Sequence, residues 1–474
     1  MRPITKGRKQ MTGYWRPWST LLMASFLLWA GAATIRAEGG ELISNVKAEL
    51  PNLRFPICLL VDDPTPCVNP LYFYMRDVDK LPAGSFNTWD APASVKMVRD
   101  ISLDFLKEYA EWISKNNIRG KFSVVPFPMG LGSIAEGLEG YDKREVDEWI
   151  KITREKIAPV CDIGPEMLTH TLGLDLKTRK LLPTRTKRDA AWEATVISDQ
   201  NLEQMTEYMT FGLEILKKAG LIATGVTQPN YYKGDQAGVY AKAVLAAVKK
   251  VNGAKLAWYF IDTDGGAQTI LPKTMYLDKA NKEAVVSIIA AAAEPTWECV
   301  TGKGDVSKIA DYYISADGTN GRFVDLMNNG SYLTFYTHWT SLYGNGTKKG
   351  FMVVQEVARR ANLHLGDRVK WMKTSEIARY WVASQTYEVK PDQEKGMIVL
   401  RFQSPFTCPE FTVSCDLVGD GKILPSCGGK PMREVTSRKD LKDNSWFRDG
   451  KKLYLCFHLQ EAATVLISIA GGSR

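Results

Sequence analysis

A few carboxylate and histidine side chains are the residues of this chain best suited to chemistry. They lie in three short segments: Asp62 and Asp63 in LLVDD, Glu166 and His170 in IGPEMLTH, and His338 at the end of YLTFYTH. The chain has only 4 histidines, and two of them fall here. Carboxylates together with an imidazole are common ligands of divalent metals. The sequence therefore predicts a metal site with Asp63, Glu166 and His170 as ligands.

This ligand set predicts hydrolytic chemistry. Glu166 and His170 are four residues apart, so a helical turn or a bent loop brings both to one ion. Three protein ligands leave positions for a water and a substrate oxygen. Asp62 could then take the proton of that water as general base, and His338 could protonate the leaving group.

Alternating strand and helix patterns must position these residues. Apolar runs typical of buried strands cover 54–61, 121–127, 160–166, 255–262 and 331–339, and amphipathic helical patterns cover 94–116, 142–157, 199–218, 239–251, 351–363 and 375–384. Residues 285–294 are ambiguous between strand and helix. This alternation over 53–385 predicts a parallel sheet, open or closed into a barrel. Function in such sheets lies at the carboxyl ends of the strands, where the candidate residues fall.

Other polar residues near predicted strand ends are candidates for substrate binding. They are Gln228 in TQPNYY, Asp264 in IDTDGG, and Tyr343 and Asn345 in the glycine-rich segment LYGNG. Asp264 precedes two glycines, so it fits a structural turn equally well. LYGNG lacks the pattern of a phosphate-binding loop.

The pattern changes near residue 386. From 386 to 474 strand-like runs alternate with Gly, Pro, Asp and Asn, which predicts a small antiparallel β-sandwich. Four of the 8 cysteines lie in this region, at positions 408, 415, 427 and 456. We expect at least one disulfide among them if the protein is exported.

The first 37 residues have the layout of a signal peptide. Basic residues precede an apolar run over 21–34, which is shorter than the roughly 20 residues needed to span a membrane. We expect cleavage after Ala37 or Ala32, and a secreted, periplasmic or cell-envelope location without stable membrane insertion. An uncleaved anchor is the alternative. The leader holds six basic and no acidic residues, so its removal leaves a net charge of about +2. A nucleic-acid partner is not expected, because no basic stripe is present.

The motifs resemble those of the polysaccharide deacetylase family, the NodB-homology or carbohydrate esterase type. The resemblance covers about 53–385 and rests on LLVDD, on IGPEMLTH, on YLTFYTH and on WMKTSEIARYW, which is similar to the closing helix of such domains. It implies a distorted (β/α) barrel, a metal-dependent deacetylase and a carbohydrate substrate. It further implies Asp62 as base, Asp63 as metal ligand and His338 as acid.

Two departures from the family pattern bear on the site. Glu166 stands where the family has a histidine, which makes the site more anionic and gives the metal a harder ligand, a carboxylate oxygen in place of a nitrogen. The expected ion is therefore divalent, zinc or manganese-like, with magnesium or calcium also favoured by the harder ligands. The family's Arg-x-Pro segment is only TQP here, so an arginine supporting the base is missing or comes from elsewhere.

Two other functions compete with deacetylation. A glycosidase on a related barrel would use two carboxylates, Asp63 or Glu166 with Asp264, about 5–9 Å apart, and would ignore chelators. A catalytically inactive glycan-binding protein is the third possibility, and the altered second motif favours it. Metal content distinguishes the metal-dependent enzyme from both.

Overall fold

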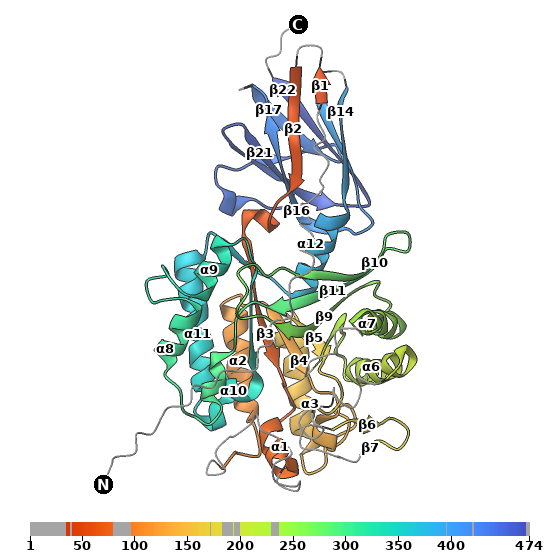
Figure 1. Ribbon diagram of the computed structural model, residues 1–474, viewed down its shortest axis with the longest axis vertical. Coiled ribbons are helices and arrows are strands. Elements are labelled where there is room, and N and C mark those ends of the chain that lie inside the picture. The colour runs from red at the N-terminus through yellow and green to blue at the C-terminus, as the bar shows by residue number, and fades with distance from the viewer. Residues whose placement is uncertain are drawn as a thin grey trace, which may run out of the picture.

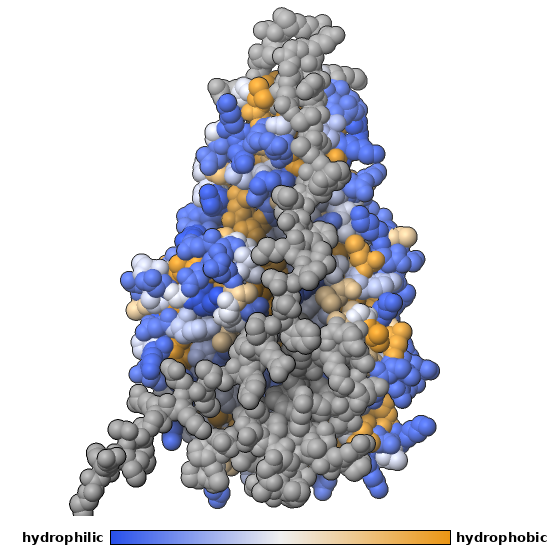
Figure 2. Space-filling model, viewed as in Figure 1, coloured by the Kyte–Doolittle hydropathy of each residue, from blue (hydrophilic) through white to orange (hydrophobic). Residues whose placement is uncertain are grey.

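The computed structural model describes residues 35–37, 40–78, 96–170, 172–182, 193, 200–228, 237–394, 396–419 and 421–470. The expected leader, 1–37, lies outside these residues apart from Ile35–Ala37, which form strand β1. Among the described helices, none has the length and apolar character needed to cross a membrane. Figure 2 shows a face on which small apolar groups are scattered among hydrophilic ones.

Two sheets of mainly parallel strands form the lower part of the molecule (Figure 1). The first runs in the order β12 (Leu333–His338), β3 (Phe55–Asp62), β4 (Gly120–Val124) and β5 (Cys161–Pro165), and β13 (Val369–Trp371) also pairs with β3. The second runs in the order β10 (Lys273–Asp278), β11 (Glu283–Ala290), β9 (Leu256–Thr263) and β8 (Gly225–Thr227). Only β10 is antiparallel to its neighbour in these two sheets, so the parallel α/β prediction is confirmed.

The two parallel sheets are joined at two places. Bridges between Ile163 and Ala223 and between Glu166 and Thr227 join β5 to β8. On the other side, the amide of Ala291, just after β11, donates to Thr334 O of β12 at 2.7 Å. The carboxyl ends of β3, β5, β8 and β12 are therefore neighbours in space.

Helices pack around these strands, most of them on the outer faces and the last one toward the upper sheets. They are α1 (Pro70–Val78), α2 (Leu103–Lys115), α3 (Lys143–Ile152), α6 (Leu202–Lys218), α7 (Ala237–Asn252), α8 (Val306–Tyr313), α9 (Arg322–Asn328), α10 (Trp339–Tyr343), α11 (Lys349–Leu365) and α12 (Thr374–Thr386). Short strands β6 (Leu174–Asp175) and β7 (Lys180–Leu181) pair in a separate hairpin. The residues 285–294 that were ambiguous in sequence form β11 and a loop.

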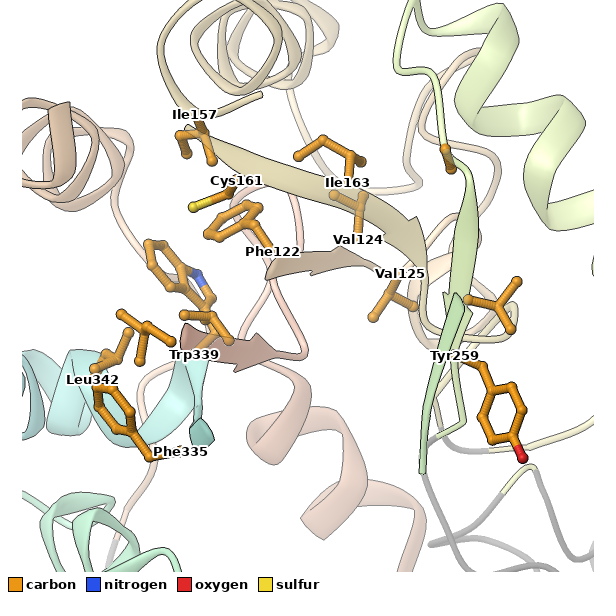
Figure 3. Close-up of a cluster of buried hydrophobic side chains, with 14 of the residues drawn as sticks. Phe122, Val124, Val125, Ile157, Cys161, Ile163, Tyr259, Phe335, Trp339 and Leu342 are labelled. Carbon is orange, nitrogen blue, oxygen red and sulfur yellow. The ribbon is translucent and has the colours of Figure 1, made fainter. Parts of the chain in front are cut away.

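Both faces of the parallel strands are buried, but in different cores. Leu59 and Val61 of β3 pack toward the helices, in the core that includes Phe122 and Trp339 (Figure 3). The alternate residue Leu60 packs in a second core with Trp258 of β9. Such two-sided burial explains why the parallel strands read as continuous apolar runs. Gly225 of β8 is required in this interior, because a Cβ there would lie 2.2 Å from the Trp258 ring.

Two further sheets form the upper part, and they share one core. One runs β1, β2 (Gly40–Ala48), β16 (Cys408–Leu417), β21 (Lys452–Leu459), β20 (Ser445–Asp449) and β19 (Arg433–Glu434). The other runs β14 (Glu388–Glu394), β15 (Met397–Gln403), β22 (Ala462–Ala470), β17 (Lys422–Cys427) and β18 (Lys430–Pro431). This is the arrangement of a β-sandwich. Strand β2 comes from the amino-terminal side of the chain, a contribution that the sequence analysis did not foresee.

The expected disulfide is wrong. All eight cysteines lie in the described part of the chain, and all are free thiols. Cys415 and Cys456 lie on the adjacent strands β16 and β21, but Cys415 packs in the core shared by the two sheets. Cys456 packs instead in a separate small cluster with Val435 and Leu441. Side chains that face opposite sides of a sheet cannot form a bridge.

Candidate metal centre

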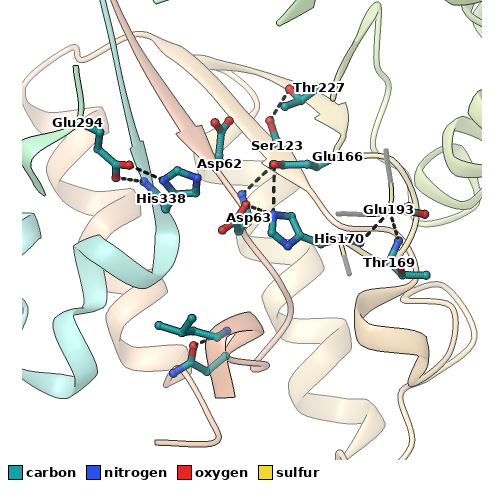
Figure 4. A network of polar contacts seen from close by, with 12 residues as sticks. Asp62, Asp63, Ser123, Glu166, Thr169, His170, Glu193, Thr227, Glu294 and His338 are labelled. Carbon is teal, nitrogen blue, oxygen red and sulfur yellow. Dashed lines mark hydrogen bonds and ion pairs between the residues drawn. The ribbon is translucent and has the colours of Figure 1, made fainter. Parts of the chain in front are cut away.

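Strand pairing gathers the candidate residues at one end of the parallel sheets. Asp62 is the last residue of β3, and His338, the last residue of β12, lies directly opposite it in the parallel register. Asp63 follows with a φ of 64°, a left-handed conformation that is rare for residues other than glycine. This turn aims Asp63 toward the segment that follows β5 (Figure 4).

Asp63, Glu166 and His170 converge on one point, as the sequence analysis predicted. Asp63 Oδ1 lies 2.6 Å from His170 Nε2, and Glu166 Oε1 lies 3.6 Å from the same nitrogen. One ligand atom from each residue lies within 4.8 Å of the other two. The side chains are 5%, 2% and 15% exposed, respectively. Within the described ranges, no other three His, Cys, Asp or Glu side chains bring their ligand atoms this close together.

The turn after β5 sets this convergence. Glu166 continues the sheet by its bridge to Thr227, and its Oε2 accepts a hydrogen bond of 2.8 Å from the Asp63 amide. Met167 and His170 have φ values of 46° and 70°. Strained backbone of this kind persists where the surrounding structure holds it, and it is common at functional sites.

The three residues fit a divalent cation by charge and by ligand type. Burial, and then the neighbouring carboxylates of Asp62 and Asp63, raise the pKa of Glu166 well above its ordinary value. Burial also acts to raise the pKa of Asp63, but the charges of His170 and His338 lower it overall. A cation between Asp63 and Glu166 would relieve the cost of two buried carboxylates. Two carboxylates and one imidazole suit zinc, manganese or a similar ion.

Asp62 has a cationic partner that the sequence analysis missed. Lys121 of β4 is 0% exposed, and its Nζ forms an ion pair with Asp62 Oδ1. The same Nζ donates to the hydroxyls of Ser123 and Thr227, and it lies 4.6 Å from the centre of the Phe260 ring. Burial raises the pKa of Asp62, and Lys121 acts against that rise. Lys121 thus places a buried positive charge beside Asp62. One feature of the sequence could have indicated this partner: Lys121 is a single charged residue at the start of the apolar run 121–127.

His338 has an acidic partner that was also missed. Its Nδ1 lies 2.6 Å from Glu294 Oε2, and its backbone amide donates to Glu294 Oε1 at 2.8 Å. Trp297 packs edge-on against the imidazole at 5.1 Å. Burial opposes a charge on His338, but Glu294 foremost, and then Asp63, raise its pKa well above the ordinary value. The Glu294 carboxylate thus favours the protonated imidazole, which is the form that a general acid needs.

Replacement of Glu294 by Gln should shift the pH dependence of turnover. The amide keeps an oxygen that can accept from His338, but its charge is gone, so the pKa of His338 falls. Because an acid must be protonated, the basic limb of the kcat/KM profile should move to lower pH. A pH series on the variant measures this. The control is Glu298→Gln, an exposed change in the short 3-10 helix Pro295–Cys299 that follows Glu294. An unmoved basic limb in Glu294→Gln would contradict the role of this pair.

The four predicted substrate-binding residues lie in different settings. Gln228 follows β8 and is 4% exposed, and its side-chain amide has no partner within the described ranges. Asp264 Oδ1 accepts from the amides of Gly266 and Ala267, which is the structural turn considered above. Tyr343 ends α10, and its ring packs 5.2 Å from that of Phe105. The side-chain oxygen of Asn345 accepts from the Val98 amide, and its Nδ2 donates to the Lys96 carbonyl. Their contact with a substrate stays a prediction.

Comparisons with known proteins give only distant likenesses. No protein-family model and no curated protein matches the chain. A solved structure from Parabacteroides distasonis, provisionally described as a glycoside hydrolase/deacetylase, shares 9% identity over 78% of this chain and 82% of its own, with a TM-score of 0.37. The γ-CGTase of Bacillus clarkii shares 10% identity over 90% and 72%, with a TM-score of 0.30. A family 30 subfamily 8 xylanase from Clostridium acetobutylicum shares 8% identity over 90% and 100%, with a TM-score of 0.28. Similarity this low decides neither fold nor activity.

Proposed function

We propose that this protein is a metal-dependent hydrolase that removes acyl groups, most simply acetyl, from a carbohydrate. The observation that carries the proposal is the convergence of Asp63, Glu166 and His170 at the strand ends. Asp62 and His338 lie beside this cluster, opposite one another on paired strands. A ligand set with an adjacent base and an adjacent acid is what metal-assisted acyl hydrolysis needs.

We infer that the parallel strands of the two lower sheets form one distorted barrel of the deacetylase type. The bridges from β5 to β8 and the hydrogen bond from Ala291, after β11, to Thr334 of β12 support this, because they join the two sheets on two sides. The interior of such a barrel opens at the carboxyl ends of its strands. Asp62, Glu166 and His338 all lie at that end.

The residues of the chain then take distinct roles. A divalent ion held by Asp63, Glu166 and His170 would polarise a bound water and the acyl carbonyl. Asp62 accepts the proton of the attacking water, and Lys121 holds its carboxylate in place. His338, held by Glu294, donates a proton to the leaving oxygen or nitrogen of the sugar. Similarity to polysaccharide deacetylases in the LLVDD and YLTFYTH segments supports a carbohydrate substrate, and the apolar leader pattern supports export to the envelope or beyond.

The glycosidase alternative has less support from the geometry. Asp264, its candidate second carboxylate, has an oxygen that already accepts two amides of its own loop. Asp63 and Glu166 instead share His170, so they are arranged around a common point. Side chains that converge on one point suit a bound cation. A glycosidase instead needs two carboxylates on opposite sides of the glycosidic bond.

Metal content tests the proposal. Purified protein should hold close to one equivalent of a divalent metal by plasma mass spectrometry, and the Glu166→Ala/His170→Ala double variant should hold almost none. Removing two of three ligands leaves too few to retain the ion. Dialysis against a chelator should abolish hydrolysis of an acetylated glycan, and added metal should restore it. Native protein that takes up no zinc, manganese or nickel would refute the deacetylase mechanism and leave the glycosidase and binding alternatives.

A further inference from the structure

A buried carboxylate outside the metal cluster holds the loop that carries His170. Glu193 is 0% exposed, and three consecutive amides donate to it. The Leu168 amide lies 3.2 Å from both of its oxygens, and the Thr169 and His170 amides each lie 2.9 Å from Oε2. Figure 4 shows Glu193 beside Thr169, on the other side of His170 from Asp63.

Consecutive amides that point to one place form a concave anion site, or nest. Here the nest lies in a turn in which Met167 and His170 both have positive φ. Without an acceptor, each of its N–H groups would lose a hydrogen bond, and a buried donor without a partner is costly. Glu193 is therefore a strong determinant of the conformation of residues 168–170.

Glu193 is itself anchored to a helix. The hydroxyl of Tyr208, on α6, donates to Glu193 Oε1 and accepts from the Leu174 amide at 3.0 Å. A chain of contacts thus runs from α6 through Tyr208 and Glu193 to the backbone of His170. The imidazole of His170 lies at its other end, against Asp63 and Glu166.

We propose that Glu193 is a positioning residue that fills the amide nest of residues 168–170, fixes the direction of the His170 imidazole, and so sets the affinity of the site for its cation. This inference rests on the proposed function for the identity of the site. Glu193 would then help to retain the cation without contacting any of the metal-binding atoms. Groups that orient metal-bound histidines commonly change metal affinity about 10–100-fold when removed.

The test compares Glu193→Ala and Glu193→Gln with the native protein in titration calorimetry with Mn²⁺ and with Zn²⁺. Glu193→Ala should weaken binding about 10–100-fold. Glu193→Gln should recover most of the affinity, because its amide oxygen can still accept from the nest. Glu203→Ala, an exposed change in the first turn of α6, should bind like the native protein. Unchanged affinity in Glu193→Ala would overturn the inference and leave the proposed function intact.

Hydrogen exchange in the metal-free protein gives a second readout. The amides of 168–170 should exchange faster in Glu193→Ala, with protection restored in Glu193→Gln, while the strands of the sandwich stay protected. Tyr208→Phe removes one support of the carboxylate without removing its charge, and it should give a smaller change in the same direction. Native-like protection of 168–170 in Glu193→Ala would overturn the inference. Native protein that binds neither ion would instead refute the proposed function, even if the exchange result shows that Glu193 orders the loop.

Discussion

Asp62→Asn is expected to lower kcat/KM for an acetylated glycan by about 10²–10⁴-fold, the usual contribution of a general base. The substitution keeps the size of the side chain, and its Oδ1 can still accept from Lys121. It removes the negative charge of the side chain, and with it the ability to take a proton from the attacking water. Because Asp62 is not among the three converging ligands, metal content should stay close to that of the native protein.

Asp264→Asn is the matched control for this variant. Asp264 is a second aspartate in a loop at the strand ends, but its oxygen caps its own turn, and asparagine makes the same turn. Turnover in Asp264→Asn should stay within about tenfold of native, since no proton transfer is lost there. Native-like turnover by Asp62→Asn with full metal occupancy would show that another group accepts the proton.

Lys121→Met is expected to cost about 3–5 kcal/mol of the free energy of unfolding, the usual effect of removing one partner from a buried ion pair. Lys121 is 0% and Asp62 7% exposed at the side chain, so the variant leaves a carboxylate buried without its cation. The hydroxyls of Ser123 and Thr227 also lose a donor. Urea denaturation monitored by circular dichroism measures the loss.

A double variant separates the charge effect from simple packing. Adding Asp62→Asn to Lys121→Met removes the unpaired charge. The double variant should therefore be more stable than Lys121→Met alone. Lys143→Met breaks an ion pair with Asp147 in which both side chains are about half exposed, and it should cost under about 1 kcal/mol. Additive losses in the double variant would contradict a direct coupling of Lys121 with Asp62.

The part of the site that could be predicted from sequence is the part that follows directly from strand ends. Asp62, Asp63, Glu166 and His338 each end an apolar run or come directly after one, and parallel strands bring such ends to one edge. His170 was predictable because it lies four residues beyond Glu166. These inferences needed only the period of the pattern and the direction of the strands.

The supporting residues could not be found in the same way. Lys121 reaches Asp62 from inside the sheet, and Glu294 reaches His338 from a loop after a strand whose type was ambiguous in sequence. Their partners lie 59 and 44 residues away, so no local pattern connects them. The expected disulfide failed for a related reason, since the spacing of cysteines does not reveal which face of a strand each one occupies.

Strand β2 imposes an order on folding. It lies at residues 40–48, yet its hydrogen-bonding partner β16 begins at Cys408, so Ala48 pairs with Val413. During synthesis from the amino terminus, β2 emerges together with its short neighbour β1 but long before β16, its partner on the other edge. Ile43 and Val46, buried in the finished core, remain in water until then, on an edge that is open to other chains. The upper sheets can close only when nearly the whole polypeptide is present, and a nascent chain that stops before β16 would leave one edge of β2 open to aggregation.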